Sequence, residues 1–253
     1  MKISATIITF NEQENIQEAC ASVSWADEIL VVDSESTDAT REIAQSCGAR
    51  VINRRWPGFA PQKQFATDNV THDWVFSLDA DERVSEKLKD SISQLRHLSE
   101  ERRADAYAVS RRAFYQGRWI RGGGWYPNRQ VRLFKRTKGR WSPRLIHETV
   151  QMATEARIEN LDGDLLHYTV ESVAQHHRMI GERYAPLAAQ QMFADGRRTS
   201  VFKIATAAPT TFLRSYLLKG GWRDGLAGFT IASFAAHHDF LKHLMLWEMQ
   251  SKR

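Results

Sequence analysis

Two aspartates, Asp79 and Asp81, stand two positions apart directly after an apolar run in the stretch WVFSLDADERV (residues 74–84). Carboxylate oxygens suit hard divalent cations such as Mg²⁺ and Mn²⁺, which one or two carboxylates usually hold together with substrate phosphates. The spacing therefore predicts a metal and diphosphate site with Asp79 and Asp81 as metal ligands. A solvated acidic turn that binds nothing is the alternative interpretation.

The apolar pattern before residue 100 predicts the elements that must position these acids. Strands are expected at 3–10, 28–33, 49–54 and 73–79, and helices within 11–26, 36–48, 61–70 and 85–98. Such alternation is typical of an α/β fold with a mostly parallel sheet flanked by helices. We place the N-caps of the first and fourth helices at Asn11 and Ser85.

The pattern changes after residue 100. Residues 104–120 alternate like strands of a mixed or antiparallel sheet, and the chain reads as helical from residue 170, with Pro209 expected to begin one helix. We therefore expect a sheet domain at 1–168 and a C-terminal helical region at 169–253.

Ligands of parallel sheets bind beyond the carboxyl ends of the strands. Asp33 ends the second expected strand, and Phe10, Asn11 and Glu12 follow the first. We expect these residues to converge on the crevice that holds the aspartate pair. As alternatives, Phe10 would be a core aromatic and Asp33 would only cap the next helix.

Composition limits the class of protein. The chain has 253 residues, of which 42% are hydrophobic, enough for one large domain or a domain with an appendage. The N-terminal sequence does not follow the pattern of a signal peptide. The apolar stretch at 225–236 is too short to cross a bilayer, and two cysteines indicate reduced cytosolic thiols.

The net charge of +5 is unevenly distributed, because acids prevail in residues 1–100 and bases in residues 101–150. The basic segment is expected to face an anionic partner. A solvated basic face is the alternative. Nucleic acid is not expected, since no recognised binding module accompanies the charge.

Several motifs carry a resemblance to a known family. TFNEQENI, VVDSESTDAT and WVFSLDADE, in this order, resemble the inverting family 2 glycosyltransferases, which have the GT-A fold. WPGFAPQKQFA, GGWYPNRQVRLFKR, IHETV and YLLKGGWRDGLAGF resemble the bacterial lipopolysaccharide core β-1,4-glucosyltransferase subfamily. The likeness spans nearly the whole chain.

The resemblance implies roles for the residues that bind the donor. Phe10 matches the aromatic that stacks on uracil, and Asp33 the acid that contacts the nucleotide base. Asp79 and Asp81 match the acids for the donor ribose and the metal diphosphate, with Asp81 the direct metal ligand. Lys63 matches a basic position that helps to hold the donor.

The resemblance also implies a catalytic base, which we assign to Glu148. His147 is the rival base. Alternatively, Glu148 would only form a salt bridge with Arg132 or Arg144. Histidine pairs elsewhere in the chain do not have the ligand pattern expected of a zinc site.

The implied reaction is a metal-dependent, inverting transfer of a hexose, glucose, from a UDP-sugar to a heptose of the lipopolysaccharide inner core. Mg²⁺ or Mn²⁺ is the implied cofactor. The implied location is cytoplasmic and peripheral, on the inner face of the cytoplasmic membrane, with the C-terminal helices at the membrane or in a homo-oligomer contact. The alternatives are another cell-envelope or lipid-linked acceptor, a nucleotidyltransferase, a phosphatase of the haloacid dehalogenase type and a non-catalytic protein.

Overall fold

The computed structural model describes residues 1–142, 148–170 and 172–251. These residues form two compact units. The first unit contains residues 1–111, 128–142 and 148–167, and the second contains residues 112–127 together with the described residues from 168 onward.

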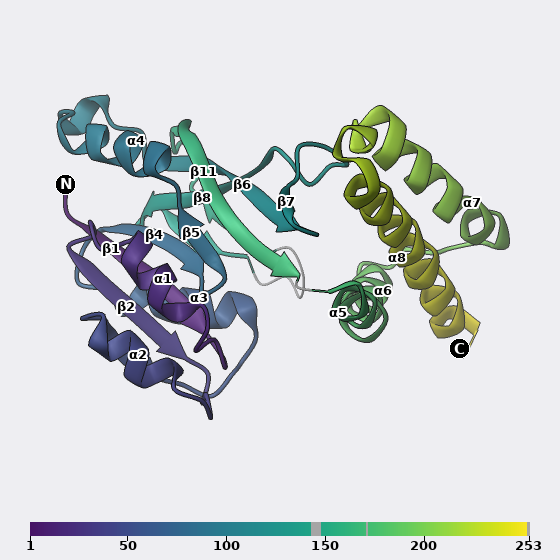
Figure 1. Ribbon diagram of the computed structural model, residues 1–253, viewed down its shortest axis with the longest axis horizontal. Coiled ribbons are helices and arrows are strands. Elements are labelled where there is room, and N and C mark those ends of the chain that lie inside the picture. The colour runs from purple at the N-terminus through teal and green to yellow at the C-terminus, as the bar shows by residue number, and fades with distance from the viewer. Residues whose placement is uncertain (143–147, 171, 252–253) are drawn as a thin grey trace. The chain divides into compact units, whose positions relative to one another are not determined.

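One mixed sheet organises the strands. The strands are β1 Ile3–Thr9, β2 Glu28–Asp33, β3 Arg50–Asn53, β4 Trp74–Asp79, β5 Glu82–Val84, β6 Ala106–Tyr115, β7 Arg118–Trp119, β8 Asn128–Lys135, β9 Gly139–Trp141, β10 Val150–Met152 and β11 Ile158–Val170. Within the described residues, nine of them form one sheet in the order β3-β2-β1-β4-β8-β6-β11-β5, with β7 on β6 (Figure 1). The strands from β3 to β4 are parallel, and β8 then pairs antiparallel with β4.

Helices complete both units. They are α1 Ile16–Ser22, α2 Thr40–Ser46, α3 Phe59–Asp68, α4 Glu86–Arg96, the 3₁₀ turn η1 Glu100–Arg102, α5 Val173–Arg178, the π turn η2 Met179–Tyr184, α6 Ala185–Ala194, α7 Val201–Leu213, the π turn η3 Arg214–Leu218, the 3₁₀ turn η4 Gly221–Asp224 and α8 Gly225–Ser251. Among the described residues, no helix has both the length and the apolar character needed to cross a membrane.

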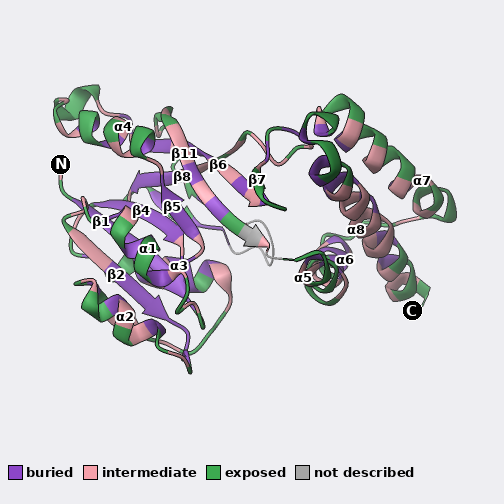
Figure 2. Ribbon diagram, viewed as in Figure 1, coloured by how far each residue is buried: buried purple, intermediate pink, exposed green. Residues whose placement is uncertain are grey.

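The first unit buries a core on each face of its sheet. On one face α1, α2 and α4 pack through residues such as Ile16, Ala44 and Leu88. On the other face α3 packs through Ala66, next to Trp141 of β9. Because both faces are covered, the central strands are almost entirely buried, which explains their continuous apolar sequences (Figure 2).

Of three expected helix starts, the structure confirms the one at Ser85 and differs from those at Asn11 and Pro209. Ser85 caps α4 as expected, since its hydroxyl accepts a hydrogen bond from the Leu88 backbone N–H at 3.3 Å. Asn11 does not cap α1, which begins only after Asn15. Asn11 instead adopts a φ of 52° and accepts a hydrogen bond from the Thr37 N–H at 2.8 Å, so its amide holds two loops together.

Pro209 does not begin a helix but lies inside α7. That helix starts at Val201, where the Ser200 hydroxyl accepts a hydrogen bond from the Lys203 N–H at 3.2 Å. An internal proline removes one backbone hydrogen bond, and helices tolerate this where packing supplies most of their stability. Here α7 packs along α8 within the second unit (Figure 1).

Candidate active site

The strand register places the expected site residues at one edge of the sheet. Thr9 of β1 pairs with Asp33 of β2, and Ile8 pairs with Asp79 of β4. All three strands therefore end together, and the loops that follow them share this edge. The strand ends thus lie at one edge of the sheet, and the convergence of the loop residues on one ligand crevice stays a prediction.

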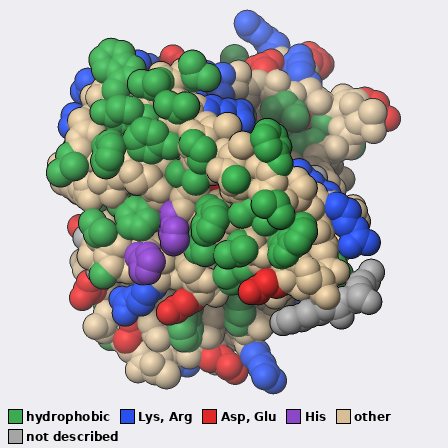
Figure 3. Space-filling model, turned by 90° about the vertical axis from the view of Figure 1, so that its right-hand side faces the viewer, with side chains coloured by type: hydrophobic (Ala, Val, Ile, Leu, Met, Phe, Trp, Pro, Cys, Tyr) green, Lys and Arg blue, Asp and Glu red, His purple; other side chains and the backbone are tan. Residues whose placement is uncertain are grey.

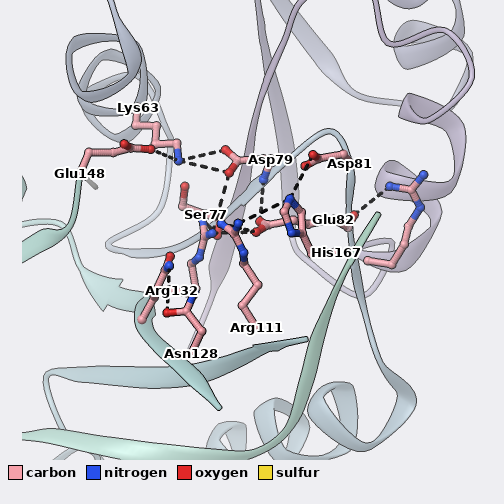
Figure 4. Close-up of polar contacts among 12 residues, drawn as sticks. Lys63, Ser77, Asp79, Asp81, Glu82, Arg111, Asn128, Arg132, Glu148 and His167 are labelled. Carbon is pink, nitrogen blue, oxygen red and sulfur yellow. Dashed lines mark hydrogen bonds and ion pairs between the residues drawn. The ribbon is translucent and has the colours of Figure 1, made fainter. Parts of the chain in front are cut away.

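Asp79 lies between two cations (Figure 4). Lys63 Nζ is 2.9 Å from its Oδ1, and Arg132 Nη2 is 3.8 Å from its Oδ2. Burial disfavours the charged carboxylate, but the positive charges of Lys63, Arg132 and Arg111 outweigh burial and hold the pKa of Asp79 well below its usual value. Asp79 is therefore a fixed negative charge over the ordinary pH range.

Lys63 joins Asp79 to Glu148. The lysine lies on the buried side of α3, only 3% exposed, and its Nζ contacts Glu148 Oε1 at 2.9 Å. The same ammonium lies 5.0 Å from the ring centre of Trp141, which limits where it can move. Glu148 thus pairs with Lys63 rather than with Arg132, and its Oε2 accepts no hydrogen bond from the described residues. His147 and Arg144 lie outside the described residues.

A second layer of charge supports this pair. Glu82 is fully buried and accepts a hydrogen bond from Arg132 Nη2 at 2.7 Å, while Arg111 Nη1 is 3.5 Å from the same carboxylate oxygen. Burial lowers the pKa of Arg132, but the carboxylates of Glu82 and Asp79 raise it above its ordinary value. Glu82 also accepts the Asp79 backbone N–H at 2.9 Å, which fixes the turn after β4.

Arg83 ties that turn to the first helix. Its guanidinium donates to the carbonyl oxygens of Ala80 and Glu82 at 2.8 and 3.0 Å and to the side chain of Asn15 at 3.0 Å. The residue is buried, so these bonds are shielded from water. The basic residue after the acids therefore acts as a local brace of the loop that carries Asp81.

Asp81 is the more open of the two aspartates. Its Oδ2 is 3.1 Å from His167 Nε2, and the structure gives its Oδ1 no partner among the described residues. His167 comes from β11, which pairs with β5 so that His167 stands opposite Glu82.

Glu12, in the loop after β1, lies close enough to Asp81 to be affected by its charge. The pKa of Glu12 is raised, first by burial and further by the negative charge of Asp81, while a hydrogen bond from Asn15 opposes the rise.

Phe10 and Asp33, the other residues expected to contact the donor nucleotide, differ in their exposure to solvent. Phe10 is 56% exposed, so it is not a core aromatic. Asp33 is fully buried, and its two carboxylate oxygens accept the N–H and hydroxyl of Ser36 at 2.8 and 2.5 Å. Because no part of Asp33 is exposed, a ligand could contact it only if the surrounding residues moved. Its visible role is to shape the loop after β2.

The donor set is suited to a hard divalent cation bound by few protein ligands. Among the described residues, no group of three or more His, Cys, Asp or Glu side chains is arranged to hold a metal. Asp81 has an open oxygen, whereas Asp79 is engaged by Lys63. This suits Mg²⁺ or Mn²⁺, which retain waters and take substrate phosphates alongside one or two carboxylates.

Much of the basic segment has internal partners. Arg132 binds Glu82, Arg118 donates to the Asp224 carbonyl at 3.0 Å, and Lys138 Nζ is 2.9 Å from Asp105. Of these three, only Arg132 is buried, whereas Arg118 and Lys138 remain exposed beside their partners.

Comparisons with known proteins identify the family. The sequence model described as "Glycosyl transferase family 2" matches residues 4–154. The chain belongs to this family. It is therefore an inverting glycosyltransferase, and its mixed sheet with flanking helices is the expected GT-A fold. The phosphatase and nucleotidyltransferase interpretations do not apply.

Two relatives match this glycosyltransferase over almost its full length. The lipopolysaccharide core biosynthesis glycosyltransferase LpsC of Rhizobium meliloti is 32% identical, across 98% of this chain and 93% of LpsC. An uncharacterized glycosyltransferase of Rickettsia typhi is 31% identical, across 99% of this chain and 88% of its own length. Among solved structures, TarS 1-349 of S. aureus in complex with UDP-GlcNAc aligns with a TM-score of 0.48 and 14% identity, covering 100% of this chain and 93% of TarS.

Sequence reasoning missed four contributors to the site. Glu82, Arg111, Arg132 and His167 were not assigned to it, although they surround the two aspartates. The available signal was the presence of a charged residue inside a buried apolar run, as in VRLF around Arg132. Such a charge requires a buried partner.

Proposed function

We propose that this glycosyltransferase moves a hexose, glucose, from a UDP-sugar to a heptose of the lipopolysaccharide inner core. The main observation behind the proposed active site is that Lys63 Nζ contacts two carboxylates, those of Asp79 and Glu148, each at 2.9 Å. It joins a candidate base to the acidic turn suited to a metal diphosphate. The near full-length likeness to LpsC, which is named for lipopolysaccharide core biosynthesis, supports the acceptor class.

The chemistry is a single displacement with Glu148 as general base. Its Oε2 would accept the proton of the acceptor hydroxyl as that oxygen attacks the anomeric carbon. Lys63 holds the opposite oxygen of Glu148 and so fixes the orientation of the carboxylate. One base is sufficient, because an inverting transfer forms no covalent enzyme intermediate.

The remaining charges serve the leaving nucleoside diphosphate. Mg²⁺ or Mn²⁺, held by Asp81 with Asp79 alongside, would supply positive charge there when bound. Lys63 and Arg132 are preorganised cations beside Asp79, at 2.9 and 3.8 Å, and their burial strengthens their field. Phe10, exposed at the end of β1, is proposed to stack on the nucleotide base, with Asn11 and Glu12 completing that loop.

The first test is calorimetric titration with UDP-glucose, UDP-galactose, UDP-N-acetylglucosamine and GDP-mannose, each with Mn²⁺ and with a chelator. We expect metal-dependent binding of UDP-glucose. The variant Asp81→Asn should lose metal-dependent binding, whereas Glu148→Gln should bind the donor normally and fail to transfer. Preference for another UDP-sugar would refute glucose as the donor, and binding that persists with the chelator would refute the metal assignment.

A different acceptor is the second candidate function. Another glycan of the cell envelope, or a lipid-linked sugar, would use the same donor site and the same base. Transfer assays with truncated lipopolysaccharide ending in inner-core heptose, and with the same material lacking that heptose, separate the two. Equal transfer to both acceptors would refute heptose. The proposed setting is the cytoplasmic face of the inner membrane.

A further inference from the structure

The second unit exposes a group of large apolar side chains where its two long helices meet. At this end η3 follows α7, and η4 leads into α8 (Figure 1). We call the exposed apolar residues here the helical tip: Leu213, Leu217, Leu218, Trp222, Leu226 and Phe229. Leu218 is 83% exposed and Trp222 is 58% exposed. Hydrophobic side chains gather on the face of the molecule shown in Figure 3.

The charges around the helical tip have one sign. Arg214, Lys219 and Arg223 are exposed between its apolar residues. The only acidic residue from 196 to 238 is Asp224, which is fully buried. The exposed residues from 213 to 229 therefore combine leucines and a tryptophan with positive charge, and none of them is acidic.

Asp224 uses its charge inside the fold. Its carboxylate accepts the backbone N–H groups of Arg121 and Gly122 at 3.0 and 2.8 Å. The Gly123 N–H donates to the Lys219 carbonyl at 3.0 Å, and the Ser215 hydroxyl donates to the Gly123 carbonyl at 2.8 Å. The turn that presents Leu218 and Trp222 is thus fastened to the glycine loop at 122–124 of the same unit.

Close packing adds to this rigidity. A side chain on Gly122 would collide with the backbone of Gly220, and one on Gly228 with the backbone of Gly221. The ring of Phe229 packs edge-on against that of Phe212, at 5.5 Å between centroids. The apolar residues are therefore displayed on a preformed turn, and binding through them requires little additional ordering.

The positive charge of the helical tip favours an anionic lipid surface over a second copy of the chain as its partner. A symmetric contact with a second copy would bring the same patch against itself, and its three cations would then face like charges. An anionic lipid surface matches both features, because apolar side chains enter the interface while Lys and Arg meet the headgroups. We propose that the helical tip inserts shallowly into the headgroup region of an anionic bilayer.

This proposal uses residues of the second unit alone. It deepens the proposed function by naming the surface that would keep the enzyme near a lipid-borne acceptor. Lipid binding can be measured without a sugar donor or acceptor. A failure of lipid binding is therefore distinguishable from a failure of the donor or acceptor assignment.

The test is flotation of the full chain with vesicles of phosphatidylglycerol and phosphatidylethanolamine, compared with vesicles of phosphatidylcholine. The wild type should float with the anionic vesicles and much less with the neutral ones. The double variant Leu218→Asp/Trp222→Asp should reduce the vesicle partition coefficient by on the order of tenfold or more. Ile158→Asp, a matched change at a 50% exposed residue of the first unit, should leave partition unchanged.

The charge contribution has its own variant. Arg214→Gln, Lys219→Gln and Arg223→Gln, combined, should weaken partition by about fivefold per residue, and added salt should reduce wild-type binding in parallel. Equal binding to both vesicle types would overturn the proposal. So would a concentration-dependent dimer, seen by analytical ultracentrifugation, that is lost in the Leu218→Asp/Trp222→Asp variant without any vesicle binding by the wild type.

Discussion

Replacing Lys63 by methionine tests the charge arrangement of the site directly. The ammonium is almost completely buried and contacts Asp79 and Glu148, each at 2.9 Å. Methionine has a similar length and no charge, so the change removes the cation with little change in volume. Asp79 would retain the more distant Arg132, whose Nη2 lies 3.8 Å away, and the weaker influence of Arg111.

The expected loss of stability follows from leaving two carboxylates without their shared cation. Removing one partner of a buried ion pair costs about 3–5 kcal/mol. Because Arg132 still faces Asp79, we expect the lower end, about 3 kcal/mol in the free energy of unfolding. For a chain of this size, that corresponds to a fall of roughly 6–12 °C in Tm.

The loss should depend on pH in a defined direction. The folded pKa of Asp79 is lowered, so its ionisation contributes stability above the unfolded value near ~4. That contribution disappears as the pH falls through the still lower folded value. Lys63→Met raises the folded pKa of Asp79 and so removes a contribution that exists only at higher pH. The difference between wild type and variant should therefore be largest near neutral pH and shrink below about pH 4.

The assay is urea denaturation of both proteins at near-neutral and acidic pH. Lys87→Met is the matched control, because Lys87 is 71% exposed and its contact with Asp162 is 3.6 Å long. Surface pairs of that kind are worth about 0–1 kcal/mol. A loss in Lys63→Met no larger than that of the control, or one that does not change with pH, would refute the arrangement described for Lys63.

Three further predictions concern single residues. Glu148→Gln should lower kcat by about 10²–10⁴-fold, and it should lower Tm less than Lys63→Met does, because Lys63 keeps its contact with Asp79 at 2.9 Å; near wild-type turnover in a transfer assay would rule it out as the base. Burial lowers the folded pKa of His176 to about 4, so stability should begin to fall as the pH drops below ~6.5 and continue to fall toward 4. The pH dependence of Tm should be flatter in His176→Phe, and an unchanged slope would contradict this. Asp224→Ala leaves the N–H groups of Arg121 and Gly122 without their acceptor and should cost about 2–3 kcal/mol in urea denaturation, with partial recovery in Asp224→Asn; a variant as stable as wild type would show that this carboxylate does not hold the loop.

The elements up to β4 were predictable because short stretches of neighbouring residues determine them. Each strand up to β4 is a short apolar run, and a helix follows each of the first three. The register then follows from parallel pairing, which brings Asp33 and Asp79 to one edge. The helix starts at Asn11 and Pro209 were wrong because tertiary contacts override local preference there, through the Thr37 hydrogen bond and the packing of α7 on α8.

The residues around the aspartates were harder to predict because they come from distant antiparallel strands. Arg132 reaches Glu82 only because β8 pairs with β4, and His167 reaches Asp81 only because β11 pairs with β5. Hydrophobic periodicity does not encode which strands pair over such separations. Lys63 and Glu148 were assigned through the family resemblance, and the structure shows the ion pair that joins them.

The buried pairing of Glu82 with Arg132 constrains how a sequence of this kind can diverge. Relatives differ from this chain at most positions, and exposed sites can change one at a time. A single neutral substitution at Glu82 would remove the 2.7 Å partner of the buried Arg132 guanidinium and leave it with the more distant Asp79 carboxylate at 3.8 Å, at a substantial cost in stability. During evolution, both residues would therefore have to change together, or an intermediate protein with only one substitution would have a lower folding stability. Across a set of homologues, positions 82 and 132 should vary jointly. Their substitution rate should be low, because two substitutions are needed and a double substitution is rarer than a single one.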